Sequence, residues 1–508
     1  MSLLATSIAL ALMNAACGGA ADTTAAVTEA AVAGTDATTL DLDETGKRRR
    51  ESERRRTSNS ATGNTATTIQ TTTTSTPSTT TTTATAPGPT NTIASVPSSV
   101  TNTTTSPALN TTQTVASVTN TAQPITGPVI MASDMEYLGA FALPVEGDRG
   151  SSRFGYGSGA ISTHRDSSTG KLTLFMSGHT NYPGHIAQVE VPDAFVKSNN
   201  WYDLPLAKLA QKFRDVTNGD LVSTSSTLGY DSNGASVFGT LPYNGQLIVS
   251  AVNWYSYSQN NSHTSVNLDF TNNTSFLGFK KIIGSDTPIR ATAGEMALIP
   301  QGWQAALGGK AFAGYGTVSV IGTASYGPAL TTFDPDAISR RTDSSGKTLL
   351  YYPASNPLCG SVGCDNTNNS LFNWTTAFHG FAPVATTQSL LFVGTHGTGG
   401  YWYGGMTSPD GSMTEPFPEN TAQGPHSTKY EYRITAYNVN DFALVNQGKL
   451  KPWEVKPYAA WSLSELTQAD PAARIRGAGY DQESGLLFVT TFFGEWARVH
   501  VYKINLQK

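Results

Sequence analysis

Short runs in which apolar and polar residues alternate fill the chain after residue 128, and the clearest set lies near its C-terminal end. Residues 476–481, 486–491 and 498–504 are rich in β-branched and aromatic side chains, and turn residues such as Ser484 and Gly485 separate them. Runs of this length with a two-residue period are typical of β-strands. This stretch is therefore predicted to form a three-stranded β-meander.

The same meander recurs four times upstream, each time after a glycine: Gly159, Gly234, Gly294 and Gly380. Repetition of one strand pattern along a chain indicates a repeat architecture. A short helical turn is expected at residues 303–307, inside the third repeat. The expected strands are 160–164, 172–177 and 186–191 in the first repeat; 235–241, 247–252, 265–270 and 276–282 in the second; 296–299, 318–321, 329–333 and 349–352 in the third; and 381–385, 390–393, 432–439 and 455–461 in the fourth.

The fifth repeat has three strands and no fourth, whereas an unassigned strand at residues 136–143 precedes the first repeat. A ring of four-stranded sheets closes when the N-terminal strand completes the last sheet, and closure removes unpaired edges. The sequence therefore predicts an all-β fold: a β-propeller of five four-stranded blades in which residues 136–143 pair with 498–504. Six or seven blades and an open β-sandwich are the alternatives.

The first 17 residues resemble an export signal. An apolar run at residues 4–13 is too short to span a bilayer, and small residues follow it up to Cys17. The pattern resembles a bacterial lipoprotein processing site with Cys17 as the lipidated residue, although Asn14 stands where an aliphatic residue is usual and no basic residue precedes the run. An ordinary secretory peptide with an unmodified cysteine is the alternative. We expect an exported protein, either attached to the membrane through Cys17 or secreted.

Residues 18–127 are dominated by Thr, Ser, Ala, Asn and Pro, which bury too little apolar surface to offset the entropy of the chain. This segment is expected to be a disordered linker between Cys17 and a folded domain at residues 128–508. A basic run at residues 47–56 could contact anionic polymers or lipid headgroups, or only keep the linker extended. The chain has a formal net charge of -5 and a pI near 5.9, which argues against a nucleic-acid partner.

The two remaining cysteines, Cys359 and Cys364, lie close together in sequence. Because an exported protein meets an oxidising environment, they are expected to form a local disulfide. A metal site is the weaker interpretation, since two thiols with no histidine nearby in sequence provide too few ligands.

Five segments form longer motifs: Tyr-Leu-Gly-Ala-Phe-Ala-Leu-Pro at 137–144, Trp-Gln-Ala-Ala-Leu-Gly-Gly at 303–309, Ser-Tyr-Gly-Pro-Ala at 325–329, Gly-Thr-His-Gly-Thr-Gly at 394–399 and Lys-Pro-Trp-Glu-Val at 451–455. Together they cover nearly the whole folded part, and they resemble an uncharacterised group of exported bacterial β-propeller-like proteins. The resemblance implies the propeller fold and export. It implies no activity.

In a propeller, the first strand of each blade runs along the central channel and the second returns, so the starts of first strands and the ends of second strands share one face. The long loops at 178–185, 353–378 and 397–429 are expected on that face, where binding residues tend to lie. Ten polar or aromatic residues are expected to surround one channel mouth there: Ser158, His179, Asn233, Asn253, Trp254, Glu295, His379, His396, Trp402 and Arg476. A structural role is the simpler interpretation of each one alone, and of the strand residues His164 and His500.

Known catalytic patterns fit this sequence poorly. Five-bladed glycosidases carry carboxylates on several inner strands, whereas Glu295 is the one acid among the strand starts here. Residues 155–159 miss a Gly-x-Ser-x-Gly nucleophile motif by one position, and residues 408–411 miss a sialidase-type box in the same way. No cofactor is expected, and a metal ion held by His179, His379 and His396 is a less favoured alternative.

Three functions are compatible with these patterns. The favoured one is a tethered module, at the cell surface or in the periplasm, that binds a glycan or another envelope polymer at the channel mouth. Aromatic residues such as Tyr182, Tyr401 and Tyr403 would stack on sugar rings. The alternatives are a hydrolase or lyase at the same mouth and a structural or adhesion protein that binds another protein. In each case the partner lies outside the cytoplasm, and the protein is expected to be a monomer.

Overall fold

The structure is a computed structural model of the 508-residue chain. It divides into two compact units, residues 1–112 and residues 113–508. In the first unit, β1 (Asp41–Leu42) and β2 (Arg48–Arg49) pair as antiparallel strands. The residues that the structure describes are 41–42, 48–49, 123–145, 152–157, 159–229, 235–253, 259–271, 274–284, 287–314, 316–317, 325–361, 364, 369–416, 424–469, 474–492 and 496–506.

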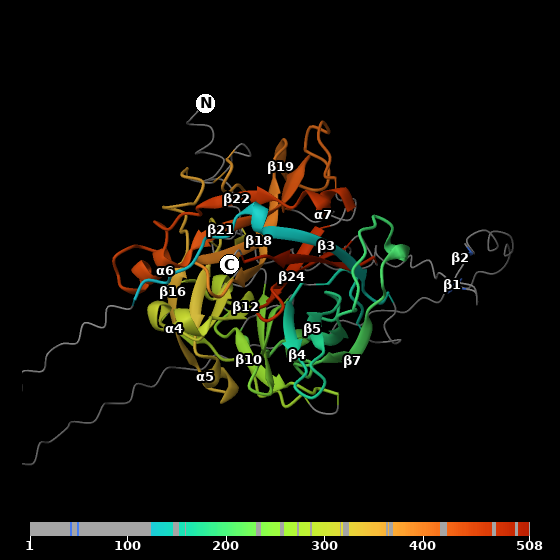
Figure 1. The fold of residues 1–508 in the computed structure, drawn as a ribbon, viewed down its shortest axis with the longest axis horizontal. Helices are drawn as coiled ribbons and strands as arrows, with labels where there is room; N and C mark the ends of the chain where they lie inside the picture. Colours follow the sequence, from blue (N-terminus) through green and yellow to red (C-terminus); the bar gives the residue numbers. More distant parts are fainter. Residues whose placement is uncertain are drawn as a thin grey trace, which may run out of the picture. The chain divides into compact units, whose positions relative to one another are not determined.

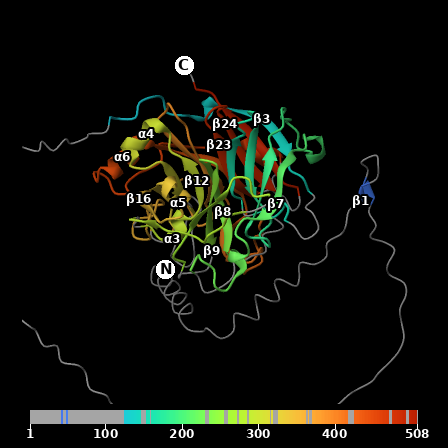
Figure 2. The same cartoon turned by 90° about the horizontal axis from the view of Figure 1, so that it is seen from below.

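The second unit consists mostly of β-strands in curled sheets, which confirms the all-β prediction (Figures 1 and 2). Its first sheet has the order β4 (Ile161–Arg165), β5 (Leu172–Ser177), β6 (His185–Glu190) and β7 (Lys208–Asp215). The first three strands match the first predicted repeat. The fourth was not predicted, because β7 alternates exposed and half-buried positions and carries few apolar residues.

The second sheet contains β8 (Ala235–Tyr243), β9 (Gln246–Asn253) and β10 (His263–Asn267). The predicted fourth strand at residues 276–282 is wrong. In that stretch Lys280 makes a single bridge to His263, and β11 (Ile282–Ile283) pairs in parallel with a strand of the third sheet. Ile282 is buried in the core beside that third sheet, which explains why its apolar side chain does not extend the second one.

The third sheet has the order β11, β16 (Ser344–Leu350), β15 (Leu330–Phe333), β13 (Ala311–Gly314) and β12 (Glu295–Leu298). The strand predicted at 318–321 lies outside the described residues, and β13 takes the second position of the sheet instead. It was missed because Ala, Phe and Gly carry a weak strand signal. The predicted helical turn at 303–307 is confirmed as α4 (Gln301–Leu307), which ends at Gly308 in the left-handed conformation.

The largest sheet joins two sets of four strands. Its order is β22 (Ala459–Ser462), β21 (Tyr430–Asn438), β18 (Ser389–Gly397), β17 (Ala377–Pro383), β23 (Arg474–Asp481), β24 (Leu486–Phe492), β25 (Arg498–Ile504) and β3 (Met135–Ala142). The two sets meet through one parallel pair, Gly380 beside Ala478. Two smaller features flank β17 and β18: β14 (Gly316–Thr317) pairs with β17, and β19 (Tyr401–Gly404) pairs with β20 (Gly424–Ser427).

The N-terminal strand completes the C-terminal set, as the sequence predicted. β3 pairs antiparallel with β25, with Phe141 opposite Val499 and Glu136 opposite Lys503. Figure 1 shows this as a cyan strand lying against the dark-red end of the chain. The outer edge of β3 is covered by a segment that the sequence did not point to: Ala140 bridges to Val196, and Ala142 bridges to Leu206. This cover satisfies backbone groups that an edge strand would leave unpaired.

The first strands of the five strand sets pack beside one another in a cycle. β4 lies beside β8, β8 beside β12, β12 beside β17, β17 beside β23, and β23 beside β4. Glycine is required at two of these approaches. Gly159 has φ +101°, and a Cβ there would stand 1.6 Å from the carbonyl oxygen of Arg476. Gly380 has φ +147°, and its Cβ would meet the carbonyl oxygen of Ala478 at 2.4 Å. Two of the glycines that open the predicted repeats thus allow strand backbones to touch.

The apolar core is divided into five main clusters, each lying between two neighbouring strand sets. The strand β18 shows how the sequence builds them. Leu390 and Phe392 belong to the cluster shared with the third sheet, whereas Leu391 and Val393 belong to the cluster shared with β23 and β24. Because successive side chains of a strand point to opposite faces, a strand buried on both faces is apolar at every position rather than at every second one.

Short helices and one N-terminal segment complete the unit. The residues before β3 dock on the strand set of β17 and β18: Ile125 accepts and donates hydrogen bonds with Asn440, and Gln388 bonds the carbonyl oxygen of Gly127. The last residues of the expected linker are therefore packed on the domain. No helix among the described residues is long and apolar enough to span a membrane. The remaining helices are η1 (Ala132–Asp134), η2 (Trp201–Asp203), η3 (Asp220–Val222), α3 (Ile289–Thr292), α5 (Pro335–Ser339), α6 (Val439–Asn446) and α7 (Ser464–Ala469).

Candidate functional site

The starts of first strands and the ends of second strands meet within each sheet, as the antiparallel registers require. Ala235 lies opposite Asn253, Glu295 opposite Gly314, and Ala377 opposite Thr395. Of the ten expected mouth residues, Ser158, Asn233 and Trp254 lie outside the described residues, as does Cys17. The other seven have distinct surroundings.

His179 and Arg476 lie at one corner, where β4, β5 and β23 come together. Gly157 bridges to His179 and also lines a cavity of about 10 Å³ with Ser177 and Arg476. That volume is enough for about one water molecule. His179 itself is 9% exposed, and burial together with the nearby Arg153 charge lowers the pKa of His179 to about 4. The imidazole is therefore neutral at neutral pH.

Glu295 is a buried carboxyl group at the start of β12. It is 5% exposed, and no hydrogen bond or ion pair joins it to any other residue that the structure describes. Burial raises the pKa of Glu295 well above its usual value. Burial is the cause of this shift. Burial thus favours the protonated form of this carboxyl group, which can donate a hydrogen bond.

His379 and Asn253 lie in two different sheets. His379 is half-buried in β17, at a register irregularity between Phe378 and Phe381. Asn253 ends β9 and is 1% exposed, and its backbone N–H donates to the Gln259 side chain at 2.8 Å. Both positions fit a structural role as well as a binding role.

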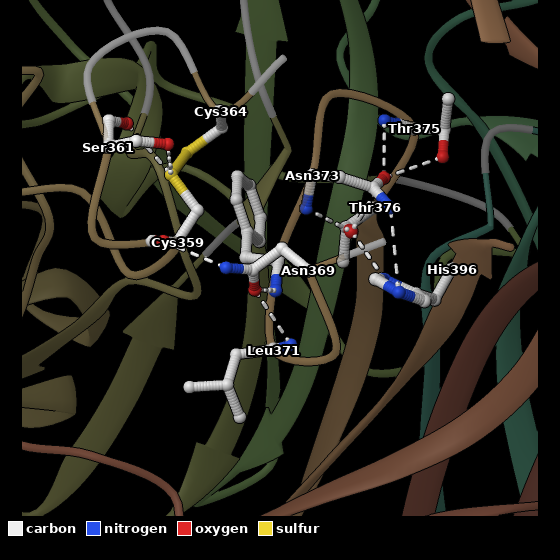
Figure 3. Close-up of a disulfide and its surroundings, with 10 residues drawn as sticks. Cys359, Ser361, Cys364, Asn369, Leu371, Asn373, Thr375, Thr376 and His396 are labelled. Atoms are coloured by element: carbon white, nitrogen blue, oxygen red, sulfur yellow. Dashed lines mark hydrogen bonds between the residues drawn. A yellow bond between two sulfur atoms is a disulfide. The ribbon is translucent and has the colours of Figure 1, made fainter. Parts of the chain in front are cut away.

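His396 anchors the loop that follows the disulfide (Figure 3). Its Nδ1 lies 2.8 Å from the Thr376 hydroxyl, and its Nε2 lies 3.5 Å from the Asn373 amide. Asn373 also caps the next turn by accepting hydrogen bonds from the backbone N–H and hydroxyl of Thr375. His396 is 2% exposed, and burial is the largest cause that lowers its pKa to about 3. His396 therefore supports the loop from within the fold.

The disulfide joins Cys359 and Cys364, with an Sγ–Sγ distance of 2.03 Å. Asn369 connects it to the loop, because its side chain donates to the carbonyl oxygen of Cys359 and accepts from the backbone of Leu371. Figure 3 shows Asn369 between the sulfur atoms and the Asn373–His396 group. The loop is thereby fixed at both ends.

Arg433 holds the same loop from β21, and the sequence did not point to it. Its guanidinium donates to the carbonyl oxygens of Ser370 at 2.8 Å and Leu371 at 2.6 Å, and the residue is 4% exposed. A planar guanidinium can bond two neighbouring carbonyls at once, which a lysine ammonium cannot do with the same geometry.

Three aromatic side chains gather where this loop meets the β19–β20 hairpin. The ring of Trp374 lies 6.4 Å from that of Tyr401 and 6.5 Å from that of Tyr403. Tyr401 and Tyr403 point to the same face of β19 because they are two residues apart. Tyr403 is 40% exposed, whereas Trp374 and Tyr401 are half-buried. We call Trp374, Tyr401 and Tyr403 the aromatic face.

Trp402 points to the other side of the hairpin from the aromatic face. It is 5% exposed and stacks on His426, with ring planes 15° apart. His426 in turn lies between two acceptors: the Glu415 carboxylate at 2.7 Å and the Gly404 carbonyl at 2.9 Å. Nε2–H of His426 donates to the Gly404 carbonyl, and Nδ1 lies within hydrogen-bond distance of the Glu415 side chain, so His426 and Glu415 form a buried hydrogen-bonded pair. No sequence motif joins these two positions, so the pair was not predicted.

A second exposed aromatic group lies at the cover of β3. Trp201, Tyr202 and Trp496 pack edge to face at 5.1–5.6 Å, and Tyr202 is 57% exposed. The indole N–H of Trp201 donates to the Ala497 carbonyl. The group ties the covering segment to β25, which accounts for its packing without a ligand.

The two strand histidines are structural, as expected. His500 is fully buried between the hydroxyls of Tyr137 and Thr491, and half-buried His164 packs its ring on Phe175. The described part of the chain contains no group of three or more His, Cys, Asp or Glu side chains that could hold a metal ion.

Comparison with known proteins adds little to this description. No family model and no curated protein sequence matches the chain. Among solved structures, a hypothetical protein from Leishmania major is similar over 73% of this chain and 92% of its own, with 9% sequence identity and a TM-score of 0.32. A likeness of this size carries no information about activity.

Proposed function

We propose that this protein is an exported binding module, tethered at the bacterial envelope or secreted, that takes a glycan or a similar polymer on one face of a five-bladed β-propeller. The cyclic packing of β4, β8, β12, β17 and β23 supports the blade number, as do the five clusters between neighbouring strand sets. The pairing of β3 with β25 supplies the fourth strand of the last blade. The N-terminal pattern that ends at Cys17 supports export and the tether.

The aromatic face carries the proposal of polymer binding. Flat aromatic rings next to polar groups suit the alternating C–H and hydroxyl surfaces of sugars. Trp374, Tyr401 and Tyr403 combine such rings with partial exposure, which a purely structural cluster does not need. The face also lies on loops, where binding residues on rigid scaffolds are concentrated.

The loop under the aromatic face is held in place before any ligand arrives. The Cys359–Cys364 disulfide, the His396 contacts and the Arg433 guanidinium each restrain residues 369–376. A surface that is ordered in advance loses less conformational entropy on binding, so more of the contact free energy appears as affinity. These buried restraints fit a binding site better than a loop that only connects two strands.

A glycan array with the purified protein tests the proposal, followed by titration calorimetry with any polymer that binds. Tyr403→Ala is expected to weaken binding by about 0.5–1.5 kcal/mol, the value of one aromatic contact. Tyr202→Ala is the matched control, because it removes another exposed tyrosine, 57% exposed against 40% for Tyr403, from the other aromatic group. Binding that is unaffected by Tyr403→Ala and lost in Tyr202→Ala would place the site at the cover of β3 instead.

One observation favours a second candidate function, a hydrolase at the same face. Burial of Glu295 favours its protonated form, which is the form that a general acid needs in glycoside hydrolysis. Such chemistry also needs a second carboxylate or an activated water, and no charge acts on Glu295 from the described residues. Incubation of a bound glycan with wild type and Glu295→Gln decides between the two functions. Products from wild type alone would establish the enzyme.

A further inference from the structure

His179 presents an unused hydrogen-bond donor from a fixed position. Its Nδ1 accepts the backbone N–H of Asn181 at 3.0 Å, and its own backbone N–H donates to the Ser152 hydroxyl at 2.7 Å. The rings of Tyr156 and Tyr182 lie on either side at 5.5 Å and 6.3 Å. Within the described residues, no hydrogen bond reaches Nε2 of His179.

These contacts decide which nitrogen carries the proton. An N–H that points at Nδ1 requires a lone pair there, so the single proton of a neutral imidazole must be on Nε2. Nε2–H is then a donor that no described residue accepts, on a residue that is 9% exposed. An acceptor atom of a ligand can therefore bond it.

We propose that His179 is the donor of an oxyanion subsite at the corner of β4, β5 and β23, which binds a carboxylate, sulfate or phosphate group of an acidic polymer. The inference rests on the proposed function for the identity of the polymer, but the chemistry of the subsite is independent of it. The Arg153 charge acts on His179, so a cationic group accompanies the donor. A donor beside positive charge selects an anionic oxygen.

The same geometry disfavours a metal ion or a cationic ligand. A metal needs an imidazole lone pair, and the lone pair of His179 is occupied by the Asn181 N–H. The Arg153 charge would repel a cation as well, just as it opposes protonation of the ring and helps to lower the pKa of His179 to about 4.

The corner is rigid enough to hold the donor in place. Tyr156 has φ +56°, an uncommon conformation for a residue with a side chain, and Gly157 pairs with His179 across the turn. Gly178 packs on Ser152 so closely that a Cβ would stand 2.0 Å from the serine hydroxyl. Backbone held in this way keeps Nε2–H in one direction.

Nitrogen-15 NMR of the histidine side chains in the intact protein tests the tautomer without a ligand. We expect His179 to be neutral at neutral pH with its proton on Nε2. A neutral ring protonated on Nδ1, or an imidazolium at neutral pH, would overturn the proposal. Addition of sulfate is expected to raise the pKa of His179 above about 4, because an anion stabilises the charged ring.

Titrations with sodium sulfate, sodium phosphate and sodium glucuronate then measure the affinity of the subsite for each anion. They show whether a sulfate, a phosphate or a carboxylate group is preferred. His179→Phe keeps the ring contacts and removes the donor, and we expect it to weaken the preferred anion at least tenfold. His164→Phe, a half-buried histidine on the same sheet, is the matched control and is expected to bind like wild type. Equal anion affinity in wild type and His179→Phe would overturn the proposal. Glycan binding that is lost in Tyr403→Ala but is unaffected by these anions would overturn the proposed oxyanion subsite and would still support the proposed function.

Discussion

Acid should destabilise the protein through His500, which is buried at the junction of the two chain ends. Its Nδ1 bonds the hydroxyl of Tyr137 on β3 at 2.9 Å, and its Nε2 bonds the hydroxyl of Thr491 on β24 at 3.1 Å. The side chain is fully buried, and burial, followed by the Arg498 charge, lowers its pKa from 6.5 to about 3. The folded protein therefore binds this proton far more weakly than the unfolded chain does.

The size of the effect follows from linkage between proton binding and folding. Between pH 6.5 and about 3, the unfolded chain carries a proton on His500 that the folded protein lacks. Stability is therefore complete above pH 6.5 and is lost as the pH falls through this window. One pKa unit corresponds to about 1.4 kcal/mol, so at about pH 4 His500 alone should remove about 3 kcal/mol from the free energy of unfolding.

Urea unfolding followed by tryptophan fluorescence, at several pH values from about 7 down to about 4, measures this loss. His500→Gln removes the titrating group while keeping a side chain that can bond Tyr137 and Thr491. We expect the variant to be less stable than wild type at neutral pH and to lose about 3 kcal/mol less on acidification. Parallel pH curves for the two proteins would refute the reasoning and show that other groups carry the acid sensitivity.

Three further predictions concern the chain ends, the disulfide and the buried acid. Deletion of residues 1–122 should leave the melting temperature unchanged, whereas deletion of 1–144 should cause unfolding or aggregation because the edge of β25 opens; equal melting curves would contradict this. The double variant Cys359→Ser, Cys364→Ser should lose about 2 kcal/mol of stability and should exchange amide hydrogens faster around the loop. Alkylation of two thiols in the non-reduced wild-type protein would mean that the disulfide does not form. The wild-type protein should lose stability as the pH rises above 4.5, since the folded Glu295 carboxyl group holds its proton to higher pH than the unfolded one. Glu295→Gln should abolish this loss. Denaturation at increasing pH measures it, and an unchanged dependence of stability on pH in the variant would contradict the prediction.

The fold was predictable where the strand pattern is strong. The runs at 486–491 and 498–504 became β24 and β25, and the orphan strand at 136–143 became β3 in the expected pairing. The pattern failed where side chains carry little information. β7 is polar because it lies at an outer edge, and β13 is built from Ala, Phe and Gly. Such strands are specified by their neighbours in the sheet and not by their own residues.

The candidate site was predictable only in part. The positions of its residues at strand ends follow from the topology of the strands, whereas the contacts of their side chains do not. The sequence pointed to His179 and Glu295 at strand ends, and both are buried polar groups with an open hydrogen-bonding position. It could not tell that Trp402 faces inward, since that depends on the register of β19 with β20. Arg433 was missed because its partners are backbone carbonyls, which leave no trace in the sequence.

The buried polar residues of the domain divide into two groups: those with hydrogen-bond partners within the protein and those that can still bond a ligand. His500 and His396 have partners at both ring nitrogens, so their burial is compensated within the protein. Neither Nε2 of His179 nor the Glu295 carboxyl group has a hydrogen bond to a described residue, so each can bond a ligand. A ligand that bonds either group binds the folded state and not the unfolded chain, so it must raise the melting temperature, and the stabilisation grows with the logarithm of the ligand concentration divided by Kd. Thermal shifts that disappear in His179→Phe or in a Glu295 variant would therefore both identify a ligand and assign it to one of the two positions.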